Sequence, residues 1–452
     1  MRSDKYEAVD SVKTPWGEVA ELRGRRLSPG PQPRGAEATR RHQSERLYGA
    51  VVALAAEQGY SKTSLRDLAR TSGVTEVNFY KCFRSKDECF LAAVDELYGT
   101  SIRMVEAGYA GERDWRQRVR AAIGALIELI VSQPAAAQVC VVNVYEAGAP
   151  GSARVERALA QFERLLARSF AASPGRALPG AIVAALIAGV QMVIHNRLQR
   201  GDVEVLPVLG PALADWVLSY AAPPPALPVP PAAPDRQRRA AAPAEVPMEE
   251  RLLHAVAEVC ANEGVSRLTG QAIVATARTS LRALYQHFPG GPEEAFLFAT
   301  EEIVGRCVAV SRAAYGTARS WPAQMNAVNR ELFGYLASEP AFAATVLVEV
   351  LAAGPKALAL RDRVLAPFGE LFEGGEALAP EVPEVVREAI VFSVYSLVSR
   401  EIAERGVAGV PGLVPTATYM ELTPYLGAAG AAAAAGRLAE AAAIAEGRPT
   451  AR

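Results

Sequence analysis

Apolar residues recur along most of this 452-residue chain at the three- and four-residue spacing that places them on one face of a helix. The pattern runs from Ser44 to about residue 221 and resumes at Pro247. Breaks in its first half fall at Gly59, Gly73, Pro134, Pro150 and Pro174. No stretch alternates between apolar and polar residues for long enough to predict a strand. The sequence therefore predicts an all-α protein.

Three segments depart from the helical pattern. Residues 1–43 mix proline, glycine and arginine, which predicts a flexible, basic extension. Residues 221–247 are too rich in proline to sustain a helix and predict an interdomain linker. Residues 427–452 are rich in alanine and glycine and predict a tail that frays or forms a weak helix. We therefore expect two helical halves, one on each side of the linker.

The order of landmark residues in the first half returns in the second. Arg46 aligns with Arg251 at an offset of 205 residues, and Trp115 aligns with Trp321 at an offset of 206. Because the offset drifts by one residue only, the pattern indicates a tandem duplication of a unit of about 200 residues. Each copy is expected to hold a small N-terminal and a larger C-terminal helical domain. These domains are predicted at residues 44–92 and 93–220 in the first copy, and at 248–297 and 298–426 in the second.

The small domain of the first copy contains two short predicted helices joined by a turn. Thr63 or Ser64 is expected to cap the first of them, and Thr75 the second, which ends near Tyr80. Gly73 lies between them and suits a tight turn with positive φ. Two short helices joined in this way form a helix-turn-helix motif, whose second helix enters the major groove of DNA.

The side chains of this motif divide into an inward and an outward set. Val74, Val77 and Phe83 are expected to point into the domain. Outward-facing asparagine can read adenine, whereas threonine, tyrosine and lysine suit phosphate contacts. A lysine at the start of the next helix can clamp a phosphate, and arginines next to the first helix can follow the DNA backbone. The predicted DNA-binding residues are Arg40, Arg41, Thr63, Ser64, Thr75, Asn78, Tyr80, Lys81 and Lys86.

Residues 73–86 follow the order Gly-Val-Thr-x-x-x-Phe-Tyr-x-x-Phe-x-Ser-Lys, which closely resembles the tetR (tetracycline-repressor) family of bacterial transcription regulators. The resemblance is strong from Ser44 to Phe90 and extends to the remaining helices only in pattern. It implies a regulator, more often a repressor, that binds double-stranded operator DNA in the bacterial cytoplasm, at the nucleoid. It also implies a small-molecule effector bound among the helices of the larger domain. The candidate effector-pocket residues are Trp115, Asn143, Tyr145, Phe162, Met192 and His195.

The second copy departs from the family pattern at the turn and at the phosphate clamp. Arg278 replaces the turn glycine, and Gly290-Gly291-Pro292 replaces the serine-lysine pair. Residues 251–295 hold four arginines against four acidic residues, whereas residues 40–90 hold nine Lys or Arg against six Asp or Glu. Two interpretations stay open, a structural or weakly binding domain and a reader of a different half-site. The second interpretation would use Ser280, Arg282, Tyr285 and His287.

Members of the family are usually homodimers whose interface is formed by the last two long helices of each subunit. The corresponding segments here are predicted at residues 181–198 and 205–220, and at residues 385–404 and 411–426. A 27-residue linker in extended form reaches about 80 Å, enough to span one such subunit. The sequence thus permits an intramolecular pseudo-dimer, and a homodimer with four motifs is the competing assembly.

Composition narrows the other classes of function. The net charge of −1 means that any DNA binding depends on a local basic surface. We expect no membrane-spanning helix, no secretory signal, no metal site and no cofactor, because the necessary apolar runs and motifs are missing. The four histidines are scattered and no catalytic motif is present, so we expect no catalytic residues. A protein-interaction scaffold that has lost DNA binding is the main alternative, and an enzyme is the weaker one.

Overall fold

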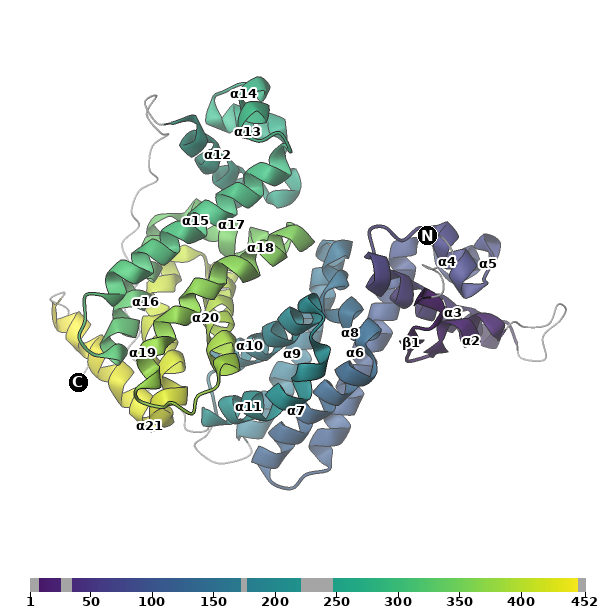
Figure 1. The fold of residues 1–452 in the computed structure, drawn as a ribbon, viewed down its shortest axis with the longest axis horizontal. Coiled ribbons are helices and arrows are strands. Elements are labelled where there is room, and N and C mark those ends of the chain that lie inside the picture. The colour runs from purple at the N-terminus through teal and green to yellow at the C-terminus, as the bar shows by residue number, and fades with distance from the viewer. Residues whose placement is uncertain (1–7, 26–34, 172–176, 221–246, 446–452) are drawn as a thin grey trace. The chain divides into compact units, whose positions relative to one another are not determined.

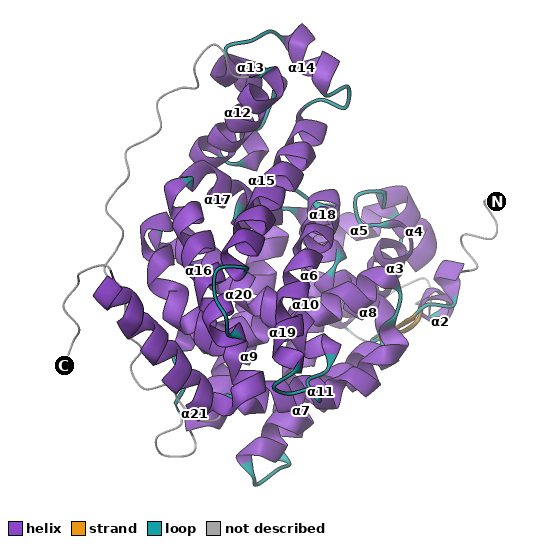
Figure 2. Cartoon of the chain, turned by 60° about the vertical axis from the view of Figure 1, so that its left-hand side comes forward, coloured by secondary structure: helices purple, strands orange, loops and turns teal. Residues whose placement is uncertain are grey.

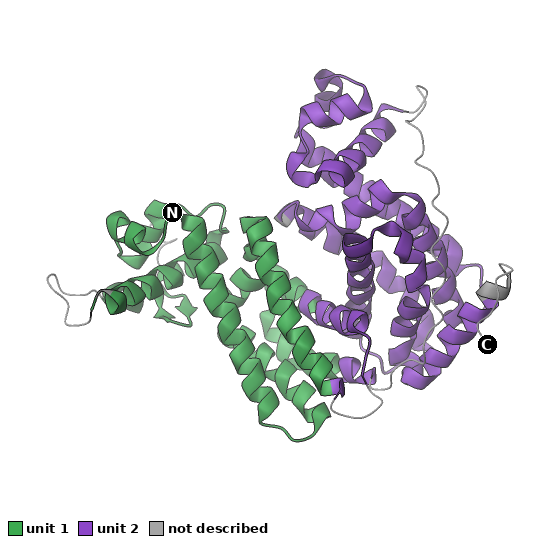
Figure 3. Cartoon of the chain, turned by 180° about the vertical axis from the view of Figure 1, so that it is seen from behind, with its two compact units in different colours: residues 1–169, 193–214 green, residues 170–192, 215–452 purple. Residues whose placement is uncertain are grey.

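The computed structural model describes residues 8–25, 35–171, 177–220 and 247–445, and almost all of them are helical (Figures 1 and 2). The predicted linker therefore lies outside the described residues, except for Pro247. The described part of the chain divides into two compact units, residues 1–169 with 193–214 and residues 170–192 with 215–452 (Figure 3). Both units are all-α apart from one short hairpin, as the hydrophobic periodicity predicts.

Unit 1 contains the first half of the helical pattern. Its small domain is formed by three helices, and the helices of its larger domain follow. The elements in and around this unit are β1 (Lys13–Thr14), β2 (Gly17–Glu18), α2 (Val19–Gly24), α3 (Ala36–Gln58), α4 (Leu65–Ser72), α5 (Glu76–Cys82), α6 (Lys86–Ala110), α7 (Trp115–Ser132), α8 (Pro134–Val141), η1 (Asn143–Ala147), α9 (Ala149–Ala171), α10 (Gly180–Arg200), η2 (Val203–Val205) and α11 (Leu206–Ser219). The core of the small domain consists of fully buried side chains from four helices, including Leu47, Leu68, Phe79 and Phe90.

Unit 2 contains the second half and the first part of α10. Its elements are α12 (Met248–Glu263), η3 (Val265–Arg267), α13 (Gly270–Ala277), α14 (Leu281–His287), α15 (Pro292–Tyr315), α16 (Trp321–Ser338), α17 (Pro340–Leu347), η4 (Glu349–Leu351), α18 (Pro355–Leu365), η5 (Ala366–Phe372), α19 (Glu373–Glu376), α20 (Glu384–Arg405), η6 (Val407–Leu413) and α21 (Val414–Ala445). Several helices have the same length as their counterparts in the first half. Helices α7 and α16 each have 18 residues, and α4 and α13 each have 8.

The described part of the N-terminal extension is folded, so the expectation of a flexible segment was wrong for residues 8–25. Strands β1 and β2 form an antiparallel hairpin in which Lys13 pairs with Glu18, and α2 follows directly. Helix α2 contacts α3 and α4, and Leu22 is buried against Gly49 of α3, where a methyl group would clash with it. The three apolar residues that anchor the segment, Val9, Val19 and Leu22, are too few and too irregularly spaced to stand out in the sequence.

Burial within the protein bears on two further segments. Helix α10 has 21 residues and is apolar enough for a membrane span by length and composition, although 72% of its most apolar window is buried within the protein. The predicted tail begins at a kink, because Gly427 has φ 68°, but the helix continues beyond the kink to Ala445. Ala431 and Ala435 are fully buried there. Packing of small alanines against a neighbour thus orders a segment whose composition alone is ambiguous.

The buried contact of Leu22 generates a prediction for stability. Leu22→Ala removes buried methyl groups and leaves a cavity beside Gly49, so we expect the free energy of unfolding to fall by about 2–5 kcal/mol. Chemical denaturation of the full chain measures the change. Leu378→Ala is the matched control, because Leu378 is 49% exposed and a substitution there should change stability by no more than about 0.5 kcal/mol. Equal stability of the two variants would mean that the N-terminal segment is not docked.

Candidate nucleic-acid interface

The turn between α4 and α5 is held by side chains of the two short helices and of α3. Ser64 caps α4 and forms a capping box with Asp67, which satisfies the free N–H groups of the first turn. Gly73 follows α4 with φ 66°, the left-handed conformation that the sequence predicts for it. The buried guanidinium of Arg46 donates hydrogen bonds of 3.1 and 2.7 Å to the carbonyl oxygen of Ser72. These bonds fix the end of α4 and therefore the direction in which α5 leaves the turn.

Helix α5 presents one apolar and one aromatic side chain to solvent. Val77 is 70% exposed and Tyr80 is 60% exposed, whereas Phe79 between them is fully buried. The expectation that Val77 points inward was wrong, because residues two positions apart in a helix point about 200° apart and Phe79 takes the inward direction. Val77 is the residue of this helix that sequence reasoning missed, and its methyl groups suit contact with a thymine methyl in the major groove.

The polar residues of α5 lie beside these two. Thr75 caps the helix, with its hydroxyl accepting from the Asn78 N–H at 3.4 Å, and Lys81 donates to the Asn78 side-chain oxygen at 3.1 Å. Both Thr75 and Lys81 are exposed, and Asn78 is half-buried. The internal bonds between them are therefore at the surface, where DNA can replace them. The structure brings Thr75, Asn78, Tyr80 and Lys81 together on one exposed helix, as the sequence predicts.

Thr63 does not belong to this surface. Its side chain is buried, and its hydroxyl donates to the Gly59 carbonyl oxygen at 3.0 Å. The prediction that Thr63 contacts DNA therefore conflicts with its burial. Of the two adjacent hydroxyl residues, Ser64 is the one that caps α4. Ser64 remains exposed while its hydroxyl accepts from the Asp67 N–H at 3.1 Å.

Lys86 has a different environment from the one the sequence predicts. Its ammonium donates to the carbonyl oxygens of Thr63 at 2.9 Å and Tyr60 at 3.3 Å, and it lies 4.2 Å from the centre of the Tyr60 ring. The start of α6 is also occupied, because the Glu88 carboxylate accepts from the Arg84 N–H at 2.5 Å. Lys86 therefore holds the loop before α4 in place, and its charge is directed at the protein.

Other cations are available on the surface of the small domain. Lys62, Arg66 and Arg84 are exposed and close in sequence to α4 and α5, and they were not singled out from the sequence. The signal that points to them is the basic excess of residues 40–90. Arg40 and Arg41 are exposed in the first turns of α3, where Arg41 forms a 3.2 Å ion pair with Glu45. These five cations can supply the phosphate contacts that position a motif on DNA.

The second small domain keeps the geometry of the turn without its glycine. Arg278 has φ 51°, the one positive φ among the described non-glycine residues, and takes the place of Gly73. A left-handed conformation costs a residue with a side chain roughly 1–2 kcal/mol. Arg251 donates to the Ala277 carbonyl oxygen at 2.5 Å, the counterpart of the bond from Arg46 to Ser72, and also to the Arg278 carbonyl oxygen at 2.8 Å. The turn is thus preserved at an energetic cost.

The exposed face of α14 carries its own set of polar residues. Ser280 caps the helix, with its hydroxyl accepting from the Ala283 N–H at 3.2 Å, and Tyr285 is 48% exposed. Arg282 and His287 are also exposed. The predicted second set of residues therefore lies on one surface. At the position of Lys86 the second half has Pro292, the first residue of α15, so the loop contact of Lys86 has no equivalent there.

The structure places the candidate effector residues in several separate contacts. The His195 ring nitrogen Nδ1 lies 3.0 Å from the Val141 carbonyl oxygen, and the Tyr145 ring stacks edge-on against His195 with centroids 6.4 Å apart. Trp115 packs against the Arg116 guanidinium, and Phe162 is half-buried on α9. Met192 belongs instead to a cluster in unit 2. A cavity described below is lined by residues of the second half.

Asn143 takes part in a link between the two domains of the first half. Its side-chain nitrogen donates to Glu146 at 2.9 Å, and Glu146 accepts from the Ser61 N–H at 2.8 Å. Burial alone would raise the pKa of Glu146, but the hydrogen bonds from Ser61 and Asn143 outweigh it and lower the pKa. Glu349 accepts from the Val265 N–H at 2.6 Å in the second half. In each half a carboxylate thus joins a short 3-10 helix to the segment that precedes the two short helices. The carboxylate is Glu146 of η1 in the first half and Glu349 of η4 in the second.

Comparison with known proteins gives a match in the small domain. The sequence pattern described as "Bacterial regulatory proteins, tetR family" matches residues 48–93. The HTH-type transcriptional activator FasR of Mycolicibacterium smegmatis is 29% identical over 112 residues, which are 25% of this chain and 51% of FasR. The chain thus spans about half the length of this curated relative.

Solved structures match with low scores. The fatty acid degradation regulator FadR from Bacillus halodurans is 18% identical with a TM-score of 0.35, and the match covers 40% of this chain and 97% of FadR. The regulator FadR from Bacillus subtilis, solved with stearoyl-CoA, is 15% identical with a TM-score of 0.36, over 39% of this chain and 97% of that protein.

The environment of Lys86 generates a test of its role. Lys86→Met keeps the aliphatic stem over Tyr60 but removes the hydrogen bonds to two carbonyl groups, so the free energy of unfolding should fall by about 1–3 kcal/mol. The exposed Lys62→Met should leave stability within about 0.5 kcal/mol and reduce the slope of log K against log salt by about 0.9. Urea denaturation and DNA titrations at several salt concentrations measure both quantities. If Lys86→Met left stability unchanged and reduced the salt slope, Lys86 would be a phosphate clamp after all.

Proposed function

Because residues 48–93 form the helix-turn-helix of the tetR family of bacterial regulatory proteins, we propose that this chain binds operator DNA mainly through α4 and α5 and responds to a small molecule. The observation that carries the proposal is the exposed surface of α5. Val77 and Tyr80 project from a helix whose direction is fixed by the bonded turn, with Asn78 and Lys81 beside them. A rigid helix with an exposed apolar residue and hydrogen-bonding neighbours suits direct reading of bases in the major groove.

We propose an unequal division of DNA binding between the two motifs. The first has exposed cations at Lys62, Arg66 and Lys81, and the residues at an offset of 205 are Arg267, Gln271 and Gln286. Each lost phosphate contact lowers the salt-dependent part of the affinity. The first motif would therefore supply most of the affinity. The alternative, a second reader of a different half-site, is supported by exposed Arg282, which suits guanine.

We further propose that the chain arose by tandem duplication and forms a single-chain pseudo-dimer. The equal helix lengths support duplication. So do two pairs of matching bonds: Arg46 donates to Ser72 as Arg251 does to Ala277, and Glu146 accepts from Ser61 as Glu349 does from Val265. Within this proposal, the domains are residues 44–92 and 93–220 in the first copy and 248–297 and 298–426 in the second, joined by the linker 221–247. A homodimer remains the competing assembly.

Contacts inside unit 2 support the pseudo-dimer. The first part of α10 belongs to this unit, and a methyl group at Gly189 would lie 2.6 Å from the Ala389 carbonyl oxygen of α20. Tyr220, which follows α11, donates to the Met420 carbonyl oxygen at 2.7 Å. Within unit 2, the first part of α10 thus contacts α20, and Tyr220 contacts α21. An intramolecular partner of this kind covers the faces that would otherwise require a second chain.

The protein would act in the bacterial cytoplasm, where operator DNA is located. Repression is the mode that the family resemblance favours, and activation is the alternative because the relative FasR carries the name of an activator. A scaffold without DNA binding is the second candidate function. It is favoured by the neutral charge of the second motif and is excluded by specific, salt-sensitive binding of DNA.

Substitutions on α5 test the proposed DNA contacts. Val77→Ala and Tyr80→Ala should each weaken binding to the chain's own upstream DNA by about 1–3 kcal/mol, because each removes a contact in the groove. Val208→Ala is the matched control for Val77, since Val208 is 78% exposed on α11. Tyr285→Ala is the matched control for Tyr80 and should change the affinity by less than about threefold. Fluorescence anisotropy measures all four, and an absence of DNA binding by the unmodified chain at low salt would favour the scaffold.

Solution mass and one glycine test the pseudo-dimer. Sedimentation should give a species near the chain mass of 47.9 kDa, and a species of twice that mass without monomer would identify a homodimer.

Gly189→Ala places a methyl group against α20 and should destabilise unit 2 by about 1–3 kcal/mol. Gly124→Ala is the matched control, because Gly124 is helical with open space around it and alanine should stabilise it by roughly 0.5–1 kcal/mol. Stabilisation by both substitutions would mean that α10 and α20 are not in contact.

A further inference from the structure

Unit 2 contains an apolar cavity of about 100 Å³ among the long helices of the second half. Helices α15, α16, α18 and α20 line it with side chains such as Val304, Phe333, Leu365 and Val398. A space of this size is several times larger than the roughly 10–15 Å³ that one water needs on the same measure. An apolar lining gives water few partners, so the cavity suits the hydrocarbon part of a small molecule.

One ionisable side chain in the lining has a single hydrogen-bond donor. Glu421 of α21 is 5% exposed, and its oxygen Oε2 accepts from the Asn329 side-chain nitrogen at 2.6 Å. Asn326 and Asn329 also donate to the Thr418 hydroxyl, at 3.2 and 3.3 Å, which holds Asn329 in place. No lysine or arginine in the described part of the chain forms an ion pair with Glu421. Burial raises the pKa of Glu421 to about 8.

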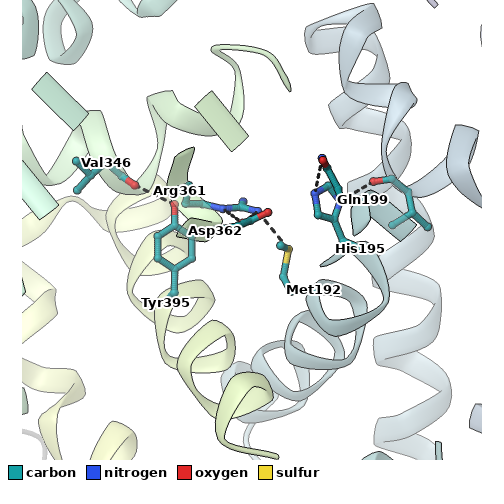
Figure 4. A network of polar contacts seen from close by, with 8 residues as sticks. Met192, His195, Gln199, Val346, Arg361, Asp362 and Tyr395 are labelled. Carbon is teal, nitrogen blue, oxygen red and sulfur yellow. Dashed lines mark hydrogen bonds and ion pairs between the residues drawn. The ribbon is translucent and has the colours of Figure 1, made fainter. Parts of the chain in front are cut away.

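The positive charge in the lining is already neutralised. Arg361 of α18 donates to Asp362 from Nε at 2.8 Å and from Nη2 at 2.6 Å, and Nη2 also lies 3.6 Å from the Met192 sulfur (Figure 4). The other titratable groups in the lining are neutral near pH 7. Burial raises the pKa of Cys307 and of Tyr395 to about 12, and the Tyr395 hydroxyl donates to the Val346 carbonyl oxygen at 2.9 Å. Glu421 is therefore the lining group with which a charged ligand can form an ion pair.

This polar arrangement is particular to the second half. Under the offsets of the duplication, Asn329 corresponds to Ile123, Thr418 to Leu213 and Glu421 to Trp216. Leu213 and Trp216 are buried apolar side chains. A carboxyl group placed in a core position costs stability unless it has a partner, because desolvation penalises its charged form.

We propose that this cavity binds an organic cation with an apolar body, such as an alkyl amine, whose ammonium group pairs with Glu421. The alkyl part lies among the aliphatic and aromatic side chains, and the ammonium donates to the carboxylate oxygens. As the effector site, this assignment rests on the proposed regulatory function, but binding itself does not. The first half would then read DNA while the second half recognises the small molecule.

The charge of Glu421 favours a cation over an anion or a neutral molecule. Because burial raises the pKa of Glu421, ionising it on binding costs affinity, by about a factor of ten for each unit by which the pKa exceeds the pH. A buried ion pair with good hydrogen bonds recovers more than that factor. A carboxylate ligand would face an acidic group instead. A neutral alcohol would form a hydrogen bond with Glu421 but no ion pair.

Three probes with the same chain length separate these cases. Isothermal titration of the full chain at pH 7 with octylamine, octan-1-ol and octanoate should give at least about tenfold tighter binding of octylamine than of the other two. Octylamine binding should release a proton, because Glu421 ionises on pairing. Two buffers with different ionisation enthalpies measure that proton.

Glu421→Gln keeps the shape of the side chain and removes its charge. It should weaken octylamine binding at least about tenfold, abolish the proton release and leave octanol binding within about threefold. Retained octanol binding shows that the cavity of the variant is intact. Glu370→Gln is the matched control, since Glu370 forms an exposed ion pair with Arg312 outside the cavity.

Several results would overturn the proposal. They are equal affinity for octylamine and octanol in the unmodified chain, tighter binding of octanoate, no binding of any probe, or an unchanged octylamine affinity in Glu421→Gln. A parallel DNA titration keeps the two proposals apart. DNA binding without amine binding contradicts only the cavity assignment, and amine binding without DNA binding contradicts only the regulatory function.

Discussion

The buried guanidinium of Arg46 is the interaction on which the DNA-binding surface depends. It donates to the last carbonyl group of α4, where the helix has no further N–H groups to satisfy that oxygen. The bond ties α3 to the end of α4, and α5 leaves the turn in a direction set by that end. Val77 and Tyr80 are exposed on the outer side of α5 because Phe79 is fixed on the inner side.

Arg251 provides the same constraint in the second half under less favourable conditions. It bonds to the carbonyl group of Ala277 at the end of α13 and to that of Arg278, whose backbone has the left-handed conformation that Gly73 adopts easily. The second motif therefore keeps its shape at the cost of strain and has lost much of its positive charge. A motif that keeps its fold while losing its cations supports the proposed division, in which one half reads DNA and the other holds the small molecule.

Sequence reasoning identified the parts of the structure that depend on local chemistry. The turn glycine, the cap at Thr75 and the all-α pattern are encoded by residues next to one another, and each was predicted, whereas the cap of α4 was left open between Thr63 and Ser64. The exposure of Val77 and the environments of Lys86 and Thr63 differ from expectation because they depend on contacts that the local sequence does not show. Lys86 is directed at carbonyl groups more than twenty residues earlier in the sequence.

The N-terminal segment and the cavity could not be predicted for a similar reason. Residues 8–25 are ordered by three apolar side chains that find a surface on α3, and sequence composition does not reveal that surface. The cavity is lined by residues from Thr300 to Glu421, and its one carboxyl group lies at a position that reads as an ordinary helical glutamate. Only the fold places Glu421 opposite Asn329 inside an apolar space.

Selection of bound DNA from a random pool tests the unequal division of DNA binding between the two motifs, because it shows how many motifs contact bases. We expect an asymmetric site, in which one half-site has strong base preferences and the other has weak or no preferences. Repeating the selection with Tyr80→Ala should erase the strong half-site. A symmetric palindrome with equal preferences in both halves would contradict the account, since it requires two equivalent readers.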